Sequence, residues 1–206
     1  MLFRSGTYQA KASAGGCNDP QTQALNVTGD VTLDFSLPNR RDTFGHACSL
    51  QGANYVEGDT ALALTGDDAS TSVDLPFEAF FYGKTYTRAH ITTNGHINFL
   101  AQNSTLSNVA LPATGLPNAA IYGFWDDLFV DSNSQMRTKL SGTAPNREFV
   151  VEWRNATFFN APATQRVDFE VVLAESGDIS LRYRNLDPAD AAFRSEERRV
   201  GKECRS

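Results

Sequence analysis

The sequence predicts an all-β fold in which an incomplete β-sandwich precedes a fuller antiparallel β-sandwich. Three observations carry this prediction. Short segments that alternate apolar and polar residues recur along the 206 residues, and Gly, Pro, Asn or Asp bound them. Long stretches with helical periodicity are scarce. Two alternating runs flank Asn94-Gly95, a pair favoured in type I′ hairpin turns, where both residues need positive φ.

Two terminal segments are predicted not to belong to the protein. The tail "RSEERRVGKECRS" (194–206) and the opening "MLFRS" (1–5) can each be back-translated into what looks like one end of a paired sequencing adapter. Such segments are set aside before fold reasoning. The alternative is a genuine basic, helical tail. On the adapter interpretation, both true termini lie elsewhere and Cys204 leaves the cysteine count.

Composition excludes two broad classes of function. The formal net charge is −6, whereas a general nucleic-acid binder needs a basic face. No apolar run approaches the length of a membrane span. The many Thr, Ser and Asn residues suit an extracellular bacterial protein.

The first unit is predicted to span residues 6–38 and to contain three strands. They cover 6–14, 22–27 and 31–38, and Pro38 ends the last one because proline cannot donate to a β-ladder. Three strands cannot bury both faces of a sandwich, so this unit is expected to be incomplete. A polar connector, 39–54, follows it.

The second unit is predicted to span residues 55–193 and to be a fuller antiparallel sandwich. It begins with a strand followed by an acidic turn (54–68), a strand reaching Pro76 and an aromatic strand broken at Gly83 (70–86), and the Asn94-Gly95 hairpin (88–100). A long irregular loop (101–118) then leads to a nearly continuous apolar strand (119–130) that is predicted to be central. Two hairpins follow, one around 142–146 (134–159) and one turning at 176–178 (166–186).

Quoted stretches of each unit resemble a known family. In the first unit, "SGTYQAKASAGGC" and "QALNVTGDVTLDFSLP" resemble the last strands of a carboxypeptidase regulatory-like domain, through Gly6, Tyr8, Ala10 and Gly29. That resemblance implies a partial transthyretin-like sandwich. In the second unit, "LPFEAFFYG", "ITTNGHINF", "AIYGFWDDL", "FVVEWRN" and "FEVVLAESGDISLRYRNL" resemble the nidogen-type extracellular β-sandwich module. This second resemblance implies an extracellular module without catalysis of its own, although His96 stands where an apolar residue is expected.

Cys17 and Cys48 lie in turn-like sequence on either side of the fragmentary first unit. A disulfide between them would join this unit to the connector and stabilise it by about 3–4 kcal/mol in the chain-entropy model. The alternative is a pair of free thiols.

"FWDDLFVD" places Asp126, Asp127 and Asp131 together at the end of the predicted central strand. Clustered carboxylates suit a hard cation such as Ca²⁺, which takes about 6–8 oxygen ligands. The alternative is a polar strand end whose carboxylates accept hydrogen bonds from loop amides. The acidic turn "TGDDAS" (65–70) has the same two interpretations.

Histidines and aromatic residues give weaker signals. His90 and His96 flank one hairpin, but neither they nor His46 complete a zinc set. The sequence holds no H-E-x-x-H, no G-x-S-x-G and no phosphate-binding glycine loop. A sugar-stacking platform is predicted as an alternative to core packing for Phe80, Phe81, Tyr82, Tyr86, Phe158 and Phe159.

These observations favour a non-catalytic extracellular module of a larger secreted or surface bacterial protein, for adhesion, ligand binding or spacing. The expected partner is an extracellular glycan or protein, with no nucleic acid and no membrane span, and no cofactor is expected beyond the Ca²⁺ alternative. The competing interpretation is an accessory, substrate- or carbohydrate-binding region of a secreted hydrolase, either a subtilisin-like protease or an α-amylase-type glycosidase.

Overall fold

A computed structural model describes residues 4–14, 16–52, 54–109, 111 and 113–186. The predicted adapter-derived tail and most of the opening segment lie outside these residues. The all-β prediction is confirmed, because the described residues form twelve strands and no helix. None of them therefore forms a helix that could cross a membrane. The chain divides into two compact units, Met1–Gly52 and Ala53–Ser206.

The first unit contains one antiparallel hairpin, formed by β1 (Gly6–Ala12) and β2 (Gln21–Val27), with Tyr8 opposite Leu25. The third predicted strand, 31–38, is wrong. Its residues alternate in exposure as a strand would, but it forms no backbone ladder within the described residues. It is held to the hairpin region by side chains instead, for example by Gln23 Nε2, which donates to Asp34 O.

The predicted disulfide is present: Cys17 and Cys48 are bonded, with their Cα atoms 5.1 Å apart. Backbone hydrogen bonds support the same place, because Arg40 N donates to Cys17 O and Cys48 N donates to Arg40 O. Cys17 is the one buried apolar residue among the described residues of this unit. The disulfide therefore supplies stability that a hydrophobic core supplies in a larger domain.

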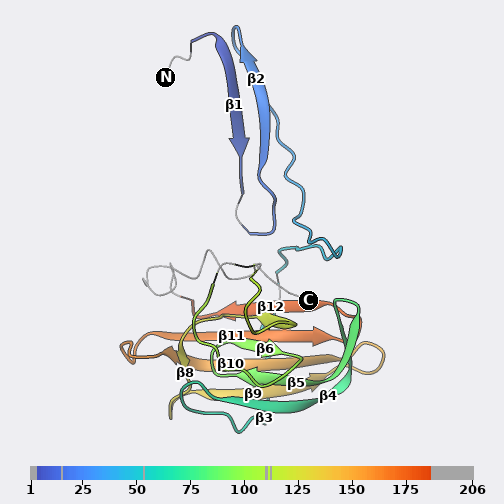
Figure 1. Cartoon of the computed structure of the whole chain (residues 1–206), viewed down its shortest axis with the longest axis vertical. Coiled ribbons are helices and arrows are strands. Elements are labelled where there is room, and N and C mark those ends of the chain that lie inside the picture. Colours follow the sequence, from blue (N-terminus) through green and yellow to red (C-terminus); the bar gives the residue numbers. More distant parts are fainter. Residues whose placement is uncertain (1–3, 15, 53, 110, 112, 187–206) are drawn as a thin grey trace. The chain divides into compact units, whose positions relative to one another are not determined.

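The second unit is a sandwich of two antiparallel sheets (Figure 1). The smaller sheet has the order β4-β5-β6-β7, and the larger has the order β12-β11-β10-β9-β3, with β8 also pairing with β10. Their bounds are β3 Thr60–Ala61, β4 Ser70–Phe81, β5 Lys84–Thr92, β6 His96–Asn98, β7 Ala120–Tyr122, β8 Leu128–Phe129, β9 Gln135–Ser141, β10 Glu148–Phe158, β11 Arg166–Ala174 and β12 Ile179–Arg184.

The hairpins predicted around 142–146 and 176–178 are confirmed as β9–β10 and β11–β12. The strand predicted to stop at Pro76 instead continues through it as β4, with a register shift between Asp74 and Ala79. An edge strand tolerates proline, since no neighbour needs its missing N–H.

The predicted continuous central strand, 119–130, is wrong. The chain forms β7 at the edge of the smaller sheet, crosses over at 123–127, and forms β8 in the larger sheet. The run 119–130 is therefore apolar because the segments on both sides of the crossover are buried, and not because it forms a central strand. Aromatic residues of the two sheets and of the crossover, Phe81, Trp153 and Phe124, meet in one core.

The Asn94-Gly95 hairpin exists, but its turn is not type I′. Ile91 pairs with Ile97, and only Gly95 has positive φ (75°). This is the three-residue loop in which glycine takes the left-handed position. A Cβ on Gly95 would also lie 1.8 Å from Phe124 O, so the close approach of the 123–127 crossover requires glycine here.

Candidate functional site

The predicted carboxylate trio does not come together. Asp131 accepts two short hydrogen bonds from Arg166, one to each of its oxygens, at 2.8 and 2.6 Å. Those bonds hold the pKa of Asp131 far below its usual range. Asp126 Oδ1 accepts from the Asp127 amide. Both carboxylates thus serve as acceptors at the end of the strand, which was the alternative interpretation of this motif.

Asp127 instead joins the acidic turn of residues 65–70. Carboxylate oxygens of Asp67, Asp68 and Asp127 lie within 4.8 Å of one another. Asp127 Oδ1 is buried and has no hydrogen-bond partner among the described residues. Burial, followed by the charges of Asp67 and Asp68, raises the pKa of Asp127.

Calcium therefore stays a prediction, now at these three carboxylates, which supply three of the about 6–8 oxygens that Ca²⁺ takes. Titration calorimetry with CaCl₂ tests it on the full chain and on the Asp127→Asn variant. Binding heat in the first that is missing in the second supports the site. No heat in either refutes it.

The three histidines have different surroundings and do not form a common site. His46 contacts Asp42 at 2.9 Å, and His90 Nδ1 lies 2.8 Å from Ser72 Oγ. His96 is fully buried beside Tyr122 and Trp125. Burial lowers the pKa of His96 to about 4, so this ring acts as a neutral packing group near pH 7.

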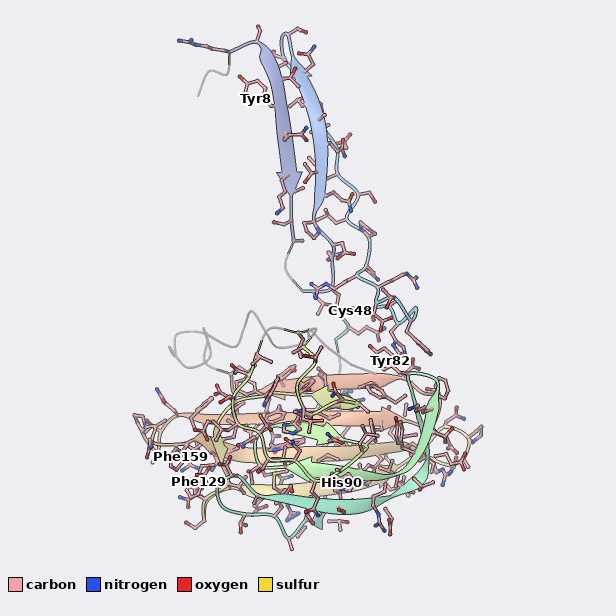
Figure 2. The ribbon with its side chains drawn as sticks, viewed as in Figure 1. Tyr8, Cys48, Tyr82, His90, Phe129 and Phe159 are labelled. Atoms are coloured by element: carbon pink, nitrogen blue, oxygen red, sulfur yellow. A yellow bond between two sulfur atoms is a disulfide. The ribbon has the colours of Figure 1, made fainter. Side chains whose placement is uncertain are left out.

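The six aromatic residues predicted as a platform do not form one. Phe81 and Phe158 belong to the core, whereas Phe80 and Phe159 remain 50% and 44% exposed. Figure 2 places Tyr82, close to Phe80 in sequence, and Phe159 at opposite ends of the sandwich.

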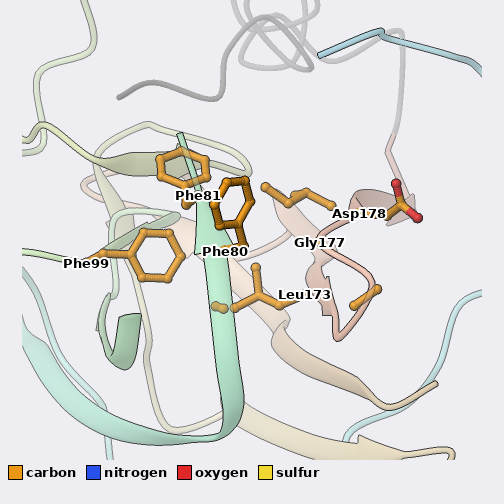
Figure 3. A pocket seen from close by; sticks show the side chains of 9 residues that line it. Phe80, Phe81, Phe99, Leu173, Gly177 and Asp178 are labelled. Atoms are coloured by element: carbon orange, nitrogen blue, oxygen red, sulfur yellow. The ribbon is translucent and has the colours of Figure 1, made fainter. Parts of the chain in front are cut away.

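Phe80 borders a small crevice of about 10 Å³. Figure 3 shows its ring beside Phe81, with the turn at Gly177 and Asp178 to one side. Asp178 Oδ2 accepts from Ser176 Oγ. The crevice has about the volume that one water molecule needs, so a larger ligand could meet only the exposed face of Phe80 beside it.

The largest polar feature was not predicted: a charged ladder on the outer face of the larger sheet. Arg137, Glu152, Glu170 and Arg182 occupy one row across β9, β10, β11 and β12, each directly opposite the next. Glu152 and Glu170 are fully buried. The ladder consists of Arg137, Glu152, Arg154, Asp168, Glu170, Arg182 and Arg184.

Arginines neutralise the two buried carboxylates. Arg154 Nη2 lies 2.7 Å from Glu152 Oε2, and Arg182 Nη1 lies 3.1 Å from Glu170 Oε1. Burial raises the pKa of Glu170, and the charge of Glu152 opposite adds to the rise, while Arg182 and a backbone amide counter it. The carboxylate oxygens of Glu152 and Glu170 also accept hydrogen bonds from donors outside the sheet.

Those donors come from an extended segment, Tyr55–Asp59, here called the strap. The strap crosses the sheet strand by strand: Arg184 of β12 lies over the Tyr55 ring at 4.1 Å, Val56 N donates to Glu170 of β11, and Gly58 N donates to Glu152 of β10. Asp59 N then donates to Thr138 O of β9.

The strap is also held through its side chains. Arg184 Nη1 donates to Glu57 Oε1 at 2.8 Å, and this bond raises the pKa of Arg184 and lowers that of Glu57. Tyr55 Oη donates to Glu152 Oε1 at 3.2 Å. Burial, with the charge of Glu152 next in effect, raises the pKa of the Tyr55 phenol far above its usual range. One arginine therefore joins the start of the unit to its last strand.

A signal for the ladder existed in the sequence. The strands "VVEWR", "VDFEVV" and "SLRYR" each carry a charged residue between apolar neighbours, and "MRTKL" carries Arg137 between Met136 and Thr138. The two predicted hairpins fix their register, so these charges could have been placed in one row. The strap itself has no sequence signal of comparable strength.

Comparison with known proteins gives one match. A family model with the description NIDO related matches residues 45–201. Curated proteins and solved structures give no match. The match supports the nidogen-like resemblance of the second unit. It does not reach the first unit's strands, whose carboxypeptidase regulatory-like resemblance stays a prediction, as does the adapter origin of 194–206.

Proposed function

Because the chain belongs to the NIDO-related family over residues 45–201, we propose that it is a non-catalytic extracellular module of a larger secreted or surface bacterial protein. Its roles are adhesion or ligand binding. The disulfide in the first unit supports an oxidising, extracellular location. The expected ligand is an extracellular glycan or protein.

The observation that carries this choice of roles is a contact between the start of the second unit and β12, the last strand among the described residues. Tyr55 lies under Arg184, the last residue of β12. A spacer is expected to hold its first and last elements apart, whereas here the first described segment of the unit lies against its last described strand. The geometry therefore favours display of a surface over the spacing role that the sequence also allowed.

The surface best placed for display lies at the other end of β12. There the β11–β12 turn, through Gly177 and Asp178, borders the crevice beside Phe80. A half-exposed aromatic ring is suited to stacking against the apolar face of a sugar ring. Phe80 is the residue to test.

The test is binding by the immobilised full chain to arrays of extracellular glycans and proteins. Saturable binding that falls at least tenfold in Phe80→Ala, but not in Phe159→Ala, supports the proposal. Phe159 is the matched control, because it is a similarly exposed phenylalanine. Binding to no array component, or binding that Phe80→Ala leaves intact, contradicts it.

The alternative is that the chain is an accessory region of a secreted hydrolase. The crevice would then position substrate for a catalytic domain elsewhere in the same protein. The source gene decides between the two: a protease or glycosidase domain in the same reading frame favours the accessory role. Hydrolysis of casein or starch by the purified chain alone would contradict both.

A further inference from the structure

The strap occupies its position on the larger sheet much as a bound peptide would. Most of its hydrogen bonds to the sheet use its main chain: Val56 N, Gly58 N and Asp59 N donate, and Gly58 O accepts from Arg154 and Arg137. The sheet therefore recognises an extended backbone more than particular side chains. The two amides that meet the buried carboxylates belong to alternate residues, which is the period of an extended chain.

The sheet side of this interface is prepared for main-chain amides. Glu152 and Glu170 face each other in register, and both are fully buried. Two adjacent buried carboxylates are costly unless charges and hydrogen-bond donors surround them. Arg154 and Arg182 supply the charge, and the amides of the strap supply further donors.

Two positions of the strap restrict which residue type can occupy them. A Cβ on Gly58 would lie 2.6 Å from Arg137 Cβ and 3.1 Å from Glu152 Oε2. Tyr55 stacks its ring against Arg184 and donates to Glu152. The site therefore requires the pattern Tyr-x-x-Gly in an extended segment, and the two residues between them are constrained less.

We infer that the charged ladder is a binding site for an extended Tyr-x-x-Gly polypeptide segment, occupied here by the chain's own strap. A second copy of the chain carries the same segment and can supply it in exchange. The strap is held by polar and ionic contacts, whereas the sandwich is held by its apolar core. It can therefore leave while the sandwich stays folded.

The experiment uses the full chain and a fluorescent peptide with the sequence of residues 53–61, "ANYVEGDTA". First, hydrogen exchange at the amides of Val56 and Asp59 is compared between the wild type and Gly58→Ala. We expect exchange at least tenfold faster in Gly58→Ala and no change in Gly52→Ala, where a Cβ meets nothing within 4 Å. Unchanged protection in Gly58→Ala overturns the inference, because the strap is then not held as described.

Second, fluorescence anisotropy measures peptide binding to the two proteins. The tethered strap of the wild type competes at an effective concentration of about millimolar, so the peptide should bind Gly58→Ala at least tenfold more tightly. A peptide with alanine in place of glycine should not bind. Equal binding to both proteins, or equal binding of both peptides, overturns the inference.

A matched pair of double variants locates the site. Gly58→Ala/Glu152→Gln should lose peptide binding at least tenfold, because Glu152 receives the glycine amide and the tyrosine hydroxyl. Gly58→Ala/Glu148→Gln should keep it. Glu148 lies on the same strand and face and contacts Arg182 at 3.6 Å. Equal loss in both double variants contradicts the assignment to the carboxylate pair.

Discussion

Asn94 is a sensitive point of the second unit, and Asn94→Ala is expected to destabilise it strongly. The side chain is fully buried. Its Nδ2 donates to Asp68 Oδ1 at 2.7 Å and to Ser104 O at 2.8 Å, and its Oδ1 accepts from Leu128 N at 3.0 Å. One amide thus joins the acidic turn, the 99–119 loop and β8.

The magnitude follows from these three bonds. A net contribution of about 0.5–1.5 kcal/mol for each of the two neutral bonds and about 1.5–3 kcal/mol for the bond to a carboxylate gives roughly 2.5–6 kcal/mol in all. Leu128 N also donates to Asp126 O, so its loss is partly covered. We expect about 3 kcal/mol, corresponding to roughly 10 °C in Tm for a domain of this size.

Urea unfolding followed by tryptophan fluorescence measures this change, because Trp125 and Trp153 both lie in the second unit. Asn133→Ala is the matched control, since Asn133 is exposed, and it should change the unfolding free energy by less than about 0.5 kcal/mol. An Asn94→Ala variant as stable as this control would refute the hydrogen-bond reasoning.

Three further predictions concern charge and covalent structure. The folded-state pKa of His96 is about 4, below the usual 6.5. The unfolded state therefore binds more protons below pH 6.5, and up to about 3 kcal/mol of stability is lost as pH falls from 6.5 to 4. Stability curves against pH should show a much smaller loss for His96→Gln; the loss should change less for His90→Gln, because partial burial and Arg88 lower the pKa of that ring only modestly, and an equal change in both variants would contradict this. Asp131→Asn should cost about 1–3 kcal/mol of unfolding free energy at pH 7 by removing the two-bond contact with Arg166. Because the pKa of Asp131 is lowered in the folded protein, the difference in stability between this variant and the wild type, measured by urea unfolding, should shrink as pH falls below about 3.9. A difference that stays constant with pH would contradict this. Cys48→Ser should destabilise the first unit by about 3–4 kcal/mol, seen as faster hydrogen exchange in β1 and β2 with unchanged tryptophan unfolding; equal exchange in both proteins would show that the cross-link is not needed.

Sequence patterns predicted those parts of the fold that depend on neighbouring residues. The β9–β10 and β11–β12 hairpins follow from alternation interrupted by glycine-containing turns. Local patterns failed where a distant partner decides the structure. Residues 31–38 alternate correctly but lack a neighbouring strand to form a ladder. Residues 119–130 are apolar throughout because both halves of a crossover are buried.

The candidate sites, too, divide into those that local sequence could predict and those that depend on distant residues. The cysteine pairing was predictable because only two cysteines remained once the tail was set aside. The acidic trio was chosen by closeness in sequence, whereas the fold gives Asp131 to Arg166 and brings Asp127 to Asp67 and Asp68. The ladder needs the register of four strands at once, and the strap depends on contacts about 80–115 residues away along the chain.

The strap lies against the last described strand, with Tyr55 under Arg184, and a distance between residues beside these two tests that placement most directly. Spin labels on Asn54→Cys and Leu186→Cys, with Cys204→Ser to remove the remaining free thiol, allow the distance to be measured in the full chain. We predict a single short distance, well below the ~36 Å length of the 11-residue strand β10. A distance comparable to that length would place the strap and the end of β12 at opposite ends of the sandwich, contradict the contact between Tyr55 and Arg184, and favour the spacer interpretation.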